Sequence, residues 1–181
     1  MENVETAERN TSLKITATYG AYLGAALVLI SFTDYLLNIY GGSTLLNVLS
    51  YAAFIGGIIW ATIAYRNRVK GGFITYGQAL RFGTLLCAFA AIILGAYTAI
   101  LVNVVDPAYL EKSFDVAAQQ MADSGRYTEE QIDVAIAASR TMMTPVSIVV
   151  LSVITYSLLG FFVSLITSAF LKKTNPNMMM E

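Results

Sequence analysis

Four apolar runs, each longer than 20 residues, constrain this chain more than any other feature of its sequence. They extend from Ile15 to Leu37, from Leu45 to Tyr65, from Phe82 to Val105 and from Val146 to Leu171. A helix rises about 1.5 Å per residue, so about 20 apolar residues cross a hydrocarbon core of roughly 30 Å. The first run lacks a basic head and exceeds the roughly 7–15 residues of a signal-peptide core, so we expect it to be retained. The sequence therefore predicts an all-α membrane protein with four transmembrane helices.

The composition agrees with a membrane protein and excludes several kinds of site. Charged residues make up 13% of the chain, whereas a soluble domain carries roughly 25%. The net charge is −1 and no basic groove is interleaved with aromatic residues, so we expect no nucleic-acid partner. The chain has no histidine, Cys87 is its only cysteine, and no serine elbow or phosphate loop is present. We therefore expect a non-enzymatic protein without catalytic residues, metal ligands or cofactors, whose main partner is the lipid bilayer.

The basic residues divide unevenly among the segments that join the apolar runs. Eight of the eleven fall on one side of the predicted membrane: Arg9, Lys14, Arg66, Arg68, Lys70, Arg81, Lys172 and Lys173. The segment 106–144 carries three basic and seven acidic residues. Lys and Arg beside transmembrane helices are retained in the cytoplasm. We therefore predict that both termini and a basic loop at 66–81 are cytoplasmic, and that segment 106–144 lies outside.

These assignments divide the chain into five segments. They are an N-terminal segment 1–13, three transmembrane helices within 14–105, an acidic hairpin 106–144, a fourth transmembrane helix 145–173 and a cytoplasmic tail 174–181. We expect a tight turn at Gly41-Gly42-Ser43, between the first two helices. The stretch from Phe73 to Arg81 mixes apolar and polar residues, which favours a helix start that lies at the lipid headgroups before the third span.

The acidic segment has the pattern of two amphipathic helices. Asp106-Pro107 is typical of an N-cap followed by proline at the first helical position. Apolar residues then recur at helical spacing: Leu110, Phe114, Ala117, Ala118 and Met121. Ser124-Gly125 interrupts this stripe, and Thr128 to Gln131 has the pattern of a capping box that begins a second helix. The acidic residues do not match a calcium-binding loop, so we predict a helical hairpin whose stripes face each other or the membrane surface.

Small residues recur at every fourth position of each apolar run, and such patterns favour close helix packing in membranes. The glycines in these patterns are Gly20, Gly24, Gly57, Gly95 and Gly160. They could pack the helices of one bundle or form an interface between copies of the chain. We favour the single bundle, because all four runs carry such a pattern; a homo-oligomer is the alternative.

Polar side chains gather at the outer ends of the predicted spans. They are Asp34, Asn38, Asn47, Asn103 and Asp106. An ionisable group within a membrane is costly and is therefore a candidate functional residue. Together the five could form a site for a cation or a small solute under the hairpin. The alternative, which we favour from the sequence, places them at the wet interface, with Asp34 bound to a hydroxyl or to Arg140.

The basic loop has two interpretations. Anionic lipid headgroups attract basic residues near the membrane surface by about 1 kcal/mol each, which makes four residues candidate lipid contacts: Arg66, Arg68, Lys70 and Arg81. The alternative is that these residues only set the topology, which the charge distribution already explains.

The stretch from Gly72 to Gly83 reads GFITYGQALRFG. In this stretch, in the four-span layout, in the Asp-Pro step after the third span and in the short basic tail, the chain resembles a bacterial family of small membrane proteins known as domain of unknown function 4199. The resemblance implies an inner-membrane protein of Gram-negative bacteria, so the outer segment would be periplasmic. It assigns no catalytic or binding residue.

Two functions of different classes fit these features. The first is an accessory protein that contacts another membrane or periplasmic protein through its hairpin, since catalytic groups are absent and the outer segment is structured. The alternative is a small transporter or channel subunit with a polar outer mouth around Asp34 and Asn103. A membrane enzyme is the least favoured of the three classes.

Overall fold

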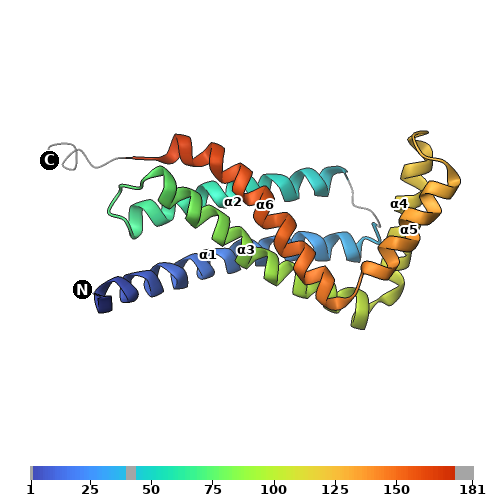
Figure 1. Ribbon diagram of the computed structural model, residues 1–181, viewed down its shortest axis with the longest axis horizontal. Coiled ribbons are helices and arrows are strands. Elements are labelled where there is room, and N and C mark those ends of the chain that lie inside the picture. The colour runs from blue at the N-terminus through green and yellow to red at the C-terminus, as the bar shows by residue number, and fades with distance from the viewer. Residues whose placement is uncertain (1, 40–43, 174–181) are drawn as a thin grey trace.

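The computed structural model describes residues 2–39 and 44–173, and within these ranges it consists of helices joined by short loops (Figure 1). The helices are α1 (Glu2–Leu36), α2 (Thr44–Arg68), α3 (Tyr76–Ile100), the π-helical turn η1 (Leu101–Val105), α4 (Pro107–Asp123), α5 (Glu129–Met142) and α6 (Pro145–Leu171). The all-α prediction is confirmed. The turn expected at Gly41-Gly42-Ser43 and the tail expected at 174–181 lie outside the described residues.

Four helices are long and apolar enough to cross a membrane. They are Thr11–Leu36 within α1, the whole of α2, Tyr76–Val105 across α3 and η1, and the whole of α6. Each coincides with one of the apolar runs of the sequence, so the expectation of four helices of membrane-spanning length is confirmed. The chain is a multi-pass membrane protein.

The loop between α2 and α3 is shorter than the basic loop 66–81 expected from the sequence. Arg66 and Arg68 belong to the last turn of α2, and Arg81 lies inside α3. The third helix begins early because Thr75 and Gln78 form a capping box, in which each side chain accepts a hydrogen bond from the other residue's backbone N–H. This early start adds the segment from Tyr76 to Arg81 to the third membrane-spanning helix, before the apolar run begins.

The loop docks on the end of α6, and its position at the lipid headgroups stays a prediction. Ile74 is 1% exposed, and its backbone exchanges two hydrogen bonds with Lys173, at 3.0 and 2.9 Å. The Nη1 of Arg66 donates to the carbonyl of Leu171 at 3.2 Å. We call this end of the bundle, which holds the start of α1, the α2–α3 loop and the end of α6, the basic end (Figure 1). The opposite end, which carries α4 and α5, is the hairpin end.

The core of the bundle is built around α3, which packs against α1, α2 and α6. Leu86 and Cys87 of α3 and Ile58 of α2 are fully buried, and they belong to a core that extends to Tyr65 and Phe82 at the basic end. The apolar surface elsewhere is largely exposed, as lipid-facing helices require. Packing is therefore densest along α3 and toward the basic end.

The five glycines singled out in the sequence all face another helix of the same chain. A Cβ added at Gly20 would lie 2.6 Å from the Cβ of Phe89, and one added at Gly95 would lie 3.0 Å from the Cα of Val149. The others make similar approaches: Gly24 faces Ala90, Gly57 faces Leu23, and Gly160 faces Cys87. The five glycines therefore allow close packing between helices of one bundle. A homo-oligomer stays a prediction and would use other surfaces.

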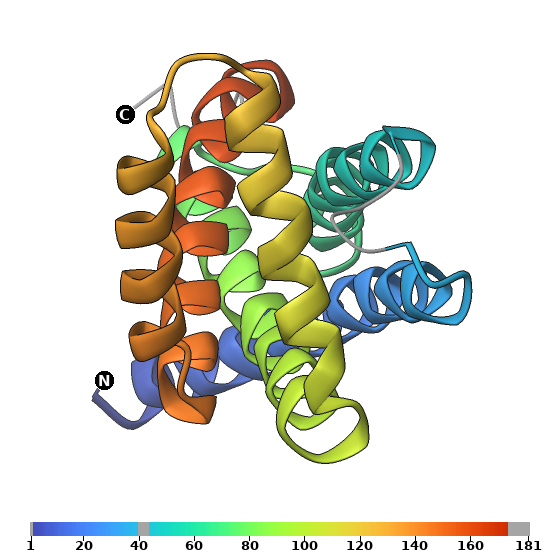
Figure 2. The same ribbon diagram turned by 90° about the vertical axis from the view of Figure 1, so that its right-hand side faces the viewer.

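The hairpin lies across one end of the bundle, with α4 and α5 side by side (Figure 2). Phe114 of α4 and Ile132 of α5 are its buried residues, each from one of the two stripes expected from the sequence. Gly125 has a φ of +63°, a value that glycine adopts without strain, and it helps to reverse the chain between the two helices. Thr128 and Gln131 form the expected capping box at the start of α5.

The junction of α3 with α4 differs from the expectation. Residues Leu101–Val105 form a π-helical turn, in which the N–H of Asp106 donates to the carbonyl of Leu101 at 2.8 Å. Asp106 occupies the N-cap position of α4, but its side chain makes no capping hydrogen bond, so the predicted cap is wrong in this respect. The extra residue that a π turn accommodates changes the direction in which the side chains beyond it point.

Candidate ligand-binding site

A cavity of about 430 Å³ opens between α1, α2, α3 and α6 in the half of the bundle nearer the hairpin. Its polar lining residues are Ser31, Asp34, Asn47, Ser50, Tyr51, Thr98, Ser152, Thr155 and Tyr156, and its apolar ones are Leu27, Phe54, Leu94 and Leu159. In Figure 1 this half of α2 stands apart from α3 and α6, whereas its other half converges with them. The cavity therefore occupies the part of the bundle where the packing of α2 is loosest.

The hydroxyl groups in the wall offer acceptors to a ligand. The Oγ1 of Thr98 donates its hydrogen to the carbonyl of Leu94 at 2.9 Å, and the Oγ of Ser152 donates to the carbonyl of Ile148 at 2.7 Å. A hydroxyl has one hydrogen and two lone pairs. Since each hydrogen is engaged by the residue's own helix, the oxygens can only accept a further hydrogen bond. These two oxygens are suited to a ligand that donates hydrogen bonds or carries positive charge.

Among the residues that the structure describes, Asp34 is the one acidic member of the lining. Its Oδ1 is buried and, within the part of the chain that the structure describes, has no hydrogen-bond partner. An unsatisfied buried polar atom costs about 1–3 kcal/mol, and more when it is charged. The bundle therefore holds an acceptor in the cavity wall that a cation or a hydrogen-bond donor would satisfy.

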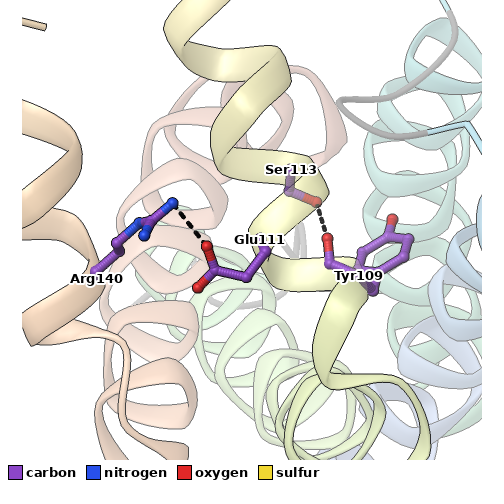
Figure 3. A network of polar contacts seen from close by, with 4 residues as sticks. All are labelled: Tyr109, Glu111, Ser113 and Arg140. Carbon is purple, nitrogen blue, oxygen red and sulfur yellow. Dashed lines mark hydrogen bonds and ion pairs between the residues drawn. The ribbon is translucent and has the colours of Figure 1, made fainter. Parts of the chain in front are cut away.

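Arg140 does not neutralise this carboxylate, as one alternative from the sequence had it. Its Nη2 lies 2.6 Å from the Oε2 of Glu111, across the hairpin from α5 to α4 (Figure 3). Its guanidinium also lies over the ring of Phe114, 5.7 Å from the centroid. Arg140 therefore interacts with residues of the hairpin, Glu111 and Phe114.

The structure brings together two of the five polar residues singled out in the sequence. Asp34 and Asn47 line the cavity, whereas the other three lie outside its lining. Asn38 has a φ of +53°, and this left-handed residue follows the end of α1. Asn103 lies within the π-helical turn, where its Nδ2 donates to the carbonyl of Ala99 at 2.9 Å, and Asp106 occupies the N-cap position of α4. The polar ring expected from the sequence is therefore reduced to a pair.

The floor of the cavity is apolar. Leu27 lies seven residues before Asp34 on α1, which places it about 10 Å deeper in the bundle. Phe54 and Leu94 are buried beside it and close the cavity toward the basic end. The lining thus changes from mostly polar near the hairpin end to apolar nearer the basic end.

A second cavity, of about 360 Å³, adjoins the first near the hairpin. The two share four wall residues: Thr98, Ser152, Thr155 and Tyr156. The remaining lining of the second cavity is mostly apolar, with Val102, Leu110, Met143, Ile148 and Leu151. Because Leu110 belongs to α4 and Met143 follows α5, the hairpin covers this side of the site.

The hydroxyl-bearing residues of the wall were missed in the sequence. Ser152, Thr155 and Tyr156 are spaced by three and four along α6 and so share one face of that helix. This polar stripe in an otherwise apolar span was the available signal. Ser31 lies three residues before Asp34, so these two residues also share one face of their helix.

The four basic residues singled out as lipid contacts separate in the structure. Arg66 binds the carbonyl of Leu171 at the end of α6. Arg68 lines a groove between α1 and α2 that also contains Tyr19 and Trp60. Lys70 and Arg81 line a different groove, between α1 and the start of α3.

No group of three or more potential metal-ligating side chains occurs among the residues that the structure describes. A family model described as "Protein of unknown function (DUF4199)" matches residues 18–173. The chain belongs to this family. The resemblance noted in the sequence is thereby confirmed over most of the chain. Neither a curated protein nor a solved structure matches this chain.

Proposed function

We propose that this DUF4199 protein binds a small organic cation in the cavity beside Asp34, as a solute-binding subunit of the transporter or channel type. The observation that carries the proposal is the buried Oδ1 of Asp34, without a hydrogen-bond partner among the described residues, in the wall of a 430 Å³ cavity. The acceptor-rich rim supports a positively charged head, and the apolar floor supports a short hydrocarbon body.

The proposal includes an orientation. We infer that the hairpin end faces the periplasm and the basic end the cytoplasm, because basic residues flanking transmembrane helices remain in the cytoplasm. The solute would then enter from the periplasmic side of an inner membrane. Support comes from the charge distribution and from the position of the cavity in the half of the bundle next to the hairpin.

Binding is tested with three probes that share a six-carbon chain: hexyltrimethylammonium, hexanol and hexanoate. Calorimetric titration of the detergent-solubilised protein should show the cation binding at least about tenfold more tightly than the alcohol, a difference of about 1.4 kcal/mol. Hexanoate should not bind, because its charge repeats that of Asp34. Asp34→Asn should remove the preference for the cation.

Asp106→Asn is the matched control, since Asp106 is an acidic residue at the same end of the bundle but outside the cavity lining. This variant should bind the cation as the unaltered protein does. The proposal would be contradicted if the protein bound the cation and the alcohol equally well. It would also be contradicted if Asp34→Asn and Asp106→Asn lost the same affinity for the cation. Flux of hexyltrimethylammonium into liposomes then separates binding from transport. The apolar floor predicts binding without flux for the isolated chain.

A second candidate function, the accessory role expected from the sequence, is favoured by the outer face of α5. Val134 and Met142 are 65% and 63% exposed, and with Ala138 they follow at intervals of four residues on one face. This face lies away from Ile132, which packs inside the hairpin. A partner protein in the periplasm would cover it. Deleting residues 108–143 should abolish co-purification of such a partner while membrane insertion persists, and an unchanged set of partners would count against this role.

A further inference from the structure

The groove between α1 and the start of α3 at the basic end combines two cations with an apolar edge. It has a volume of about 440 Å³ and contains Lys70 and Arg81, together with Ser12, Gln78 and Leu85. In the part of the chain that the structure describes, neither Lys70 nor Arg81 forms an ion pair. Two cations in one groove, whose lining among the described side chains contains no carboxylate, attract an anion.

The back of the groove is built from rigid contacts. Tyr65 is 3% exposed, its ring stacks on Phe82 with centroids 4.2 Å apart, and its hydroxyl is hydrogen-bonded to Ser12 at 2.7 Å. These contacts fix the end of α2 against both α1 and α3. The positions from which the two cations project are therefore held in place before any ligand arrives.

The edges of the groove are apolar and partly exposed. Leu13 of α1 and Leu85 of α3 both line it, and they are 37% and 43% exposed. Leu85 lies four residues after Arg81, one helical turn deeper in the membrane-spanning segment. A ligand whose anionic group meets the cations can therefore extend an apolar chain along the helices below them.

We propose that this groove is a binding site for an anionic phospholipid, whose phosphate contacts Lys70 and Arg81 and whose acyl chain lies along Leu13 and Leu85. The proposal distinguishes this pair from the other basic residues of the same end. Arg66 is engaged by the carbonyl of Leu171, and Arg68 lies in the separate groove between α1 and α2. It is also independent of the cation cavity, which lies in the opposite half of the bundle.

The test compares two double variants that remove the same charge from the same end. Lys70→Gln/Arg81→Gln alters the groove, and Arg68→Gln/Lys172→Gln leaves it intact. Native mass spectrometry of the full chain measures the affinity for phosphatidylglycerol relative to phosphatidylcholine with identical acyl chains. The groove variant should lose roughly tenfold to thirtyfold of this preference, as expected for two headgroup contacts, and the control less than about threefold.

Equal losses in the two variants would overturn the proposal, because they would show attraction by the whole basic end. Displacement of phosphatidylglycerol by millimolar inorganic phosphate would also overturn it, because the ligand would then be a free phosphate. All four altered side chains are exposed, so circular dichroism should be unchanged. A third variant, Leu85→Asn, should weaken binding of both phospholipids while it preserves the preference for the anionic one.

Discussion

Replacing Gly20 with alanine tests how closely α1 approaches α3. The new Cβ would lie 2.6 Å from the Cβ of Phe89 and 2.9 Å from the carbonyl oxygen of Leu86, whereas ordinary contacts of this kind are 3.4 Å or longer. The oxygen belongs to the α3 backbone and cannot rotate away, so α1 has to move outward. Overpacking of this kind typically costs about 1–3 kcal/mol.

Gly56→Ala provides the matched control. Gly56 also lies inside a membrane-spanning helix, but a Cβ added there would meet nothing within 4 Å. Both substitutions gain the same helix propensity, about 1 kcal/mol relative to glycine. The difference between the two variants therefore isolates the steric term, and Gly20→Ala should be less stable by about 1–3 kcal/mol.

Reversible unfolding in mixed micelles, driven by increasing mole fraction of sodium dodecyl sulfate and followed by circular dichroism, measures this difference. Gly57→Ala should fall between the two, because its Cβ would meet the end of the Leu23 side chain, which can rotate. If Gly20→Ala and Gly56→Ala unfold at the same point, the close packing of α1 on α3 is refuted.

Three further predictions concern the caps, the hairpin and the orientation. Thr75→Ala should lower the free energy of unfolding by about 1 kcal/mol, because it removes the capping box with Gln78, and chemical denaturation in micelles measures the loss. Glu111→Gln should cost less than about 1 kcal/mol, because both partners of its ion pair with Arg140 are about half exposed; a larger loss in the same assay would show that this pair holds the hairpin closed. A cysteine at Ser124 should react with an impermeant thiol reagent in intact cells, and reaction only after lysis would reverse the proposed orientation.

The membrane-spanning helices could be predicted from the sequence because hydrocarbon length imposes a simple rule. Any span needs about 20 apolar residues, and no tertiary contact is required to apply this rule. Local caps could also be predicted: Thr128 caps α5 as its sequence pattern indicates. Asp106 shows the limit of such predictions. The sequence pattern correctly predicts that Asp106 is the N-cap of α4, but the side chain does not form the expected capping hydrogen bond.

The cavity could be predicted only in part, because its composition depends on how each helix is rotated. Asp34 and Asn47 were identifiable as costly polar groups near the ends of apolar runs. Asn103 looked equivalent in the sequence, but it lies within the π-helical turn that follows α3 and is not part of the cavity lining. Ser152 and Thr155 carry no charge, so no rule of membrane cost singled them out.

The basic stretch makes a contact that its sequence does not indicate. The mixture of apolar and polar residues from Phe73 to Arg81 predicts a helix start at the lipid headgroups, but it does not predict that Ile74 is buried. In the fold its backbone pairs with Lys173, a contact across about 100 residues of sequence that no local pattern encodes. Likewise, Arg66 and Arg81 could not be distinguished in the sequence, since both are basic residues of the same stretch. Arg66 donates a hydrogen bond to the carbonyl of Leu171 only because α2 and α6 pack together.

The most direct test of the cation cavity measures the charge that its wall presents to water. A cysteine at Asn47, which lines the cavity, is reacted with a cationic and an anionic methanethiosulfonate of similar size, while the native Cys87 stays buried. The cationic reagent should react about tenfold faster, and Asp34→Asn should bring the two rates close together. A cysteine at Asn103, outside the cavity, should not respond to Asp34→Asn. Equal rates for the two reagents at position 47 in the presence of Asp34 would contradict the cavity as a cation site.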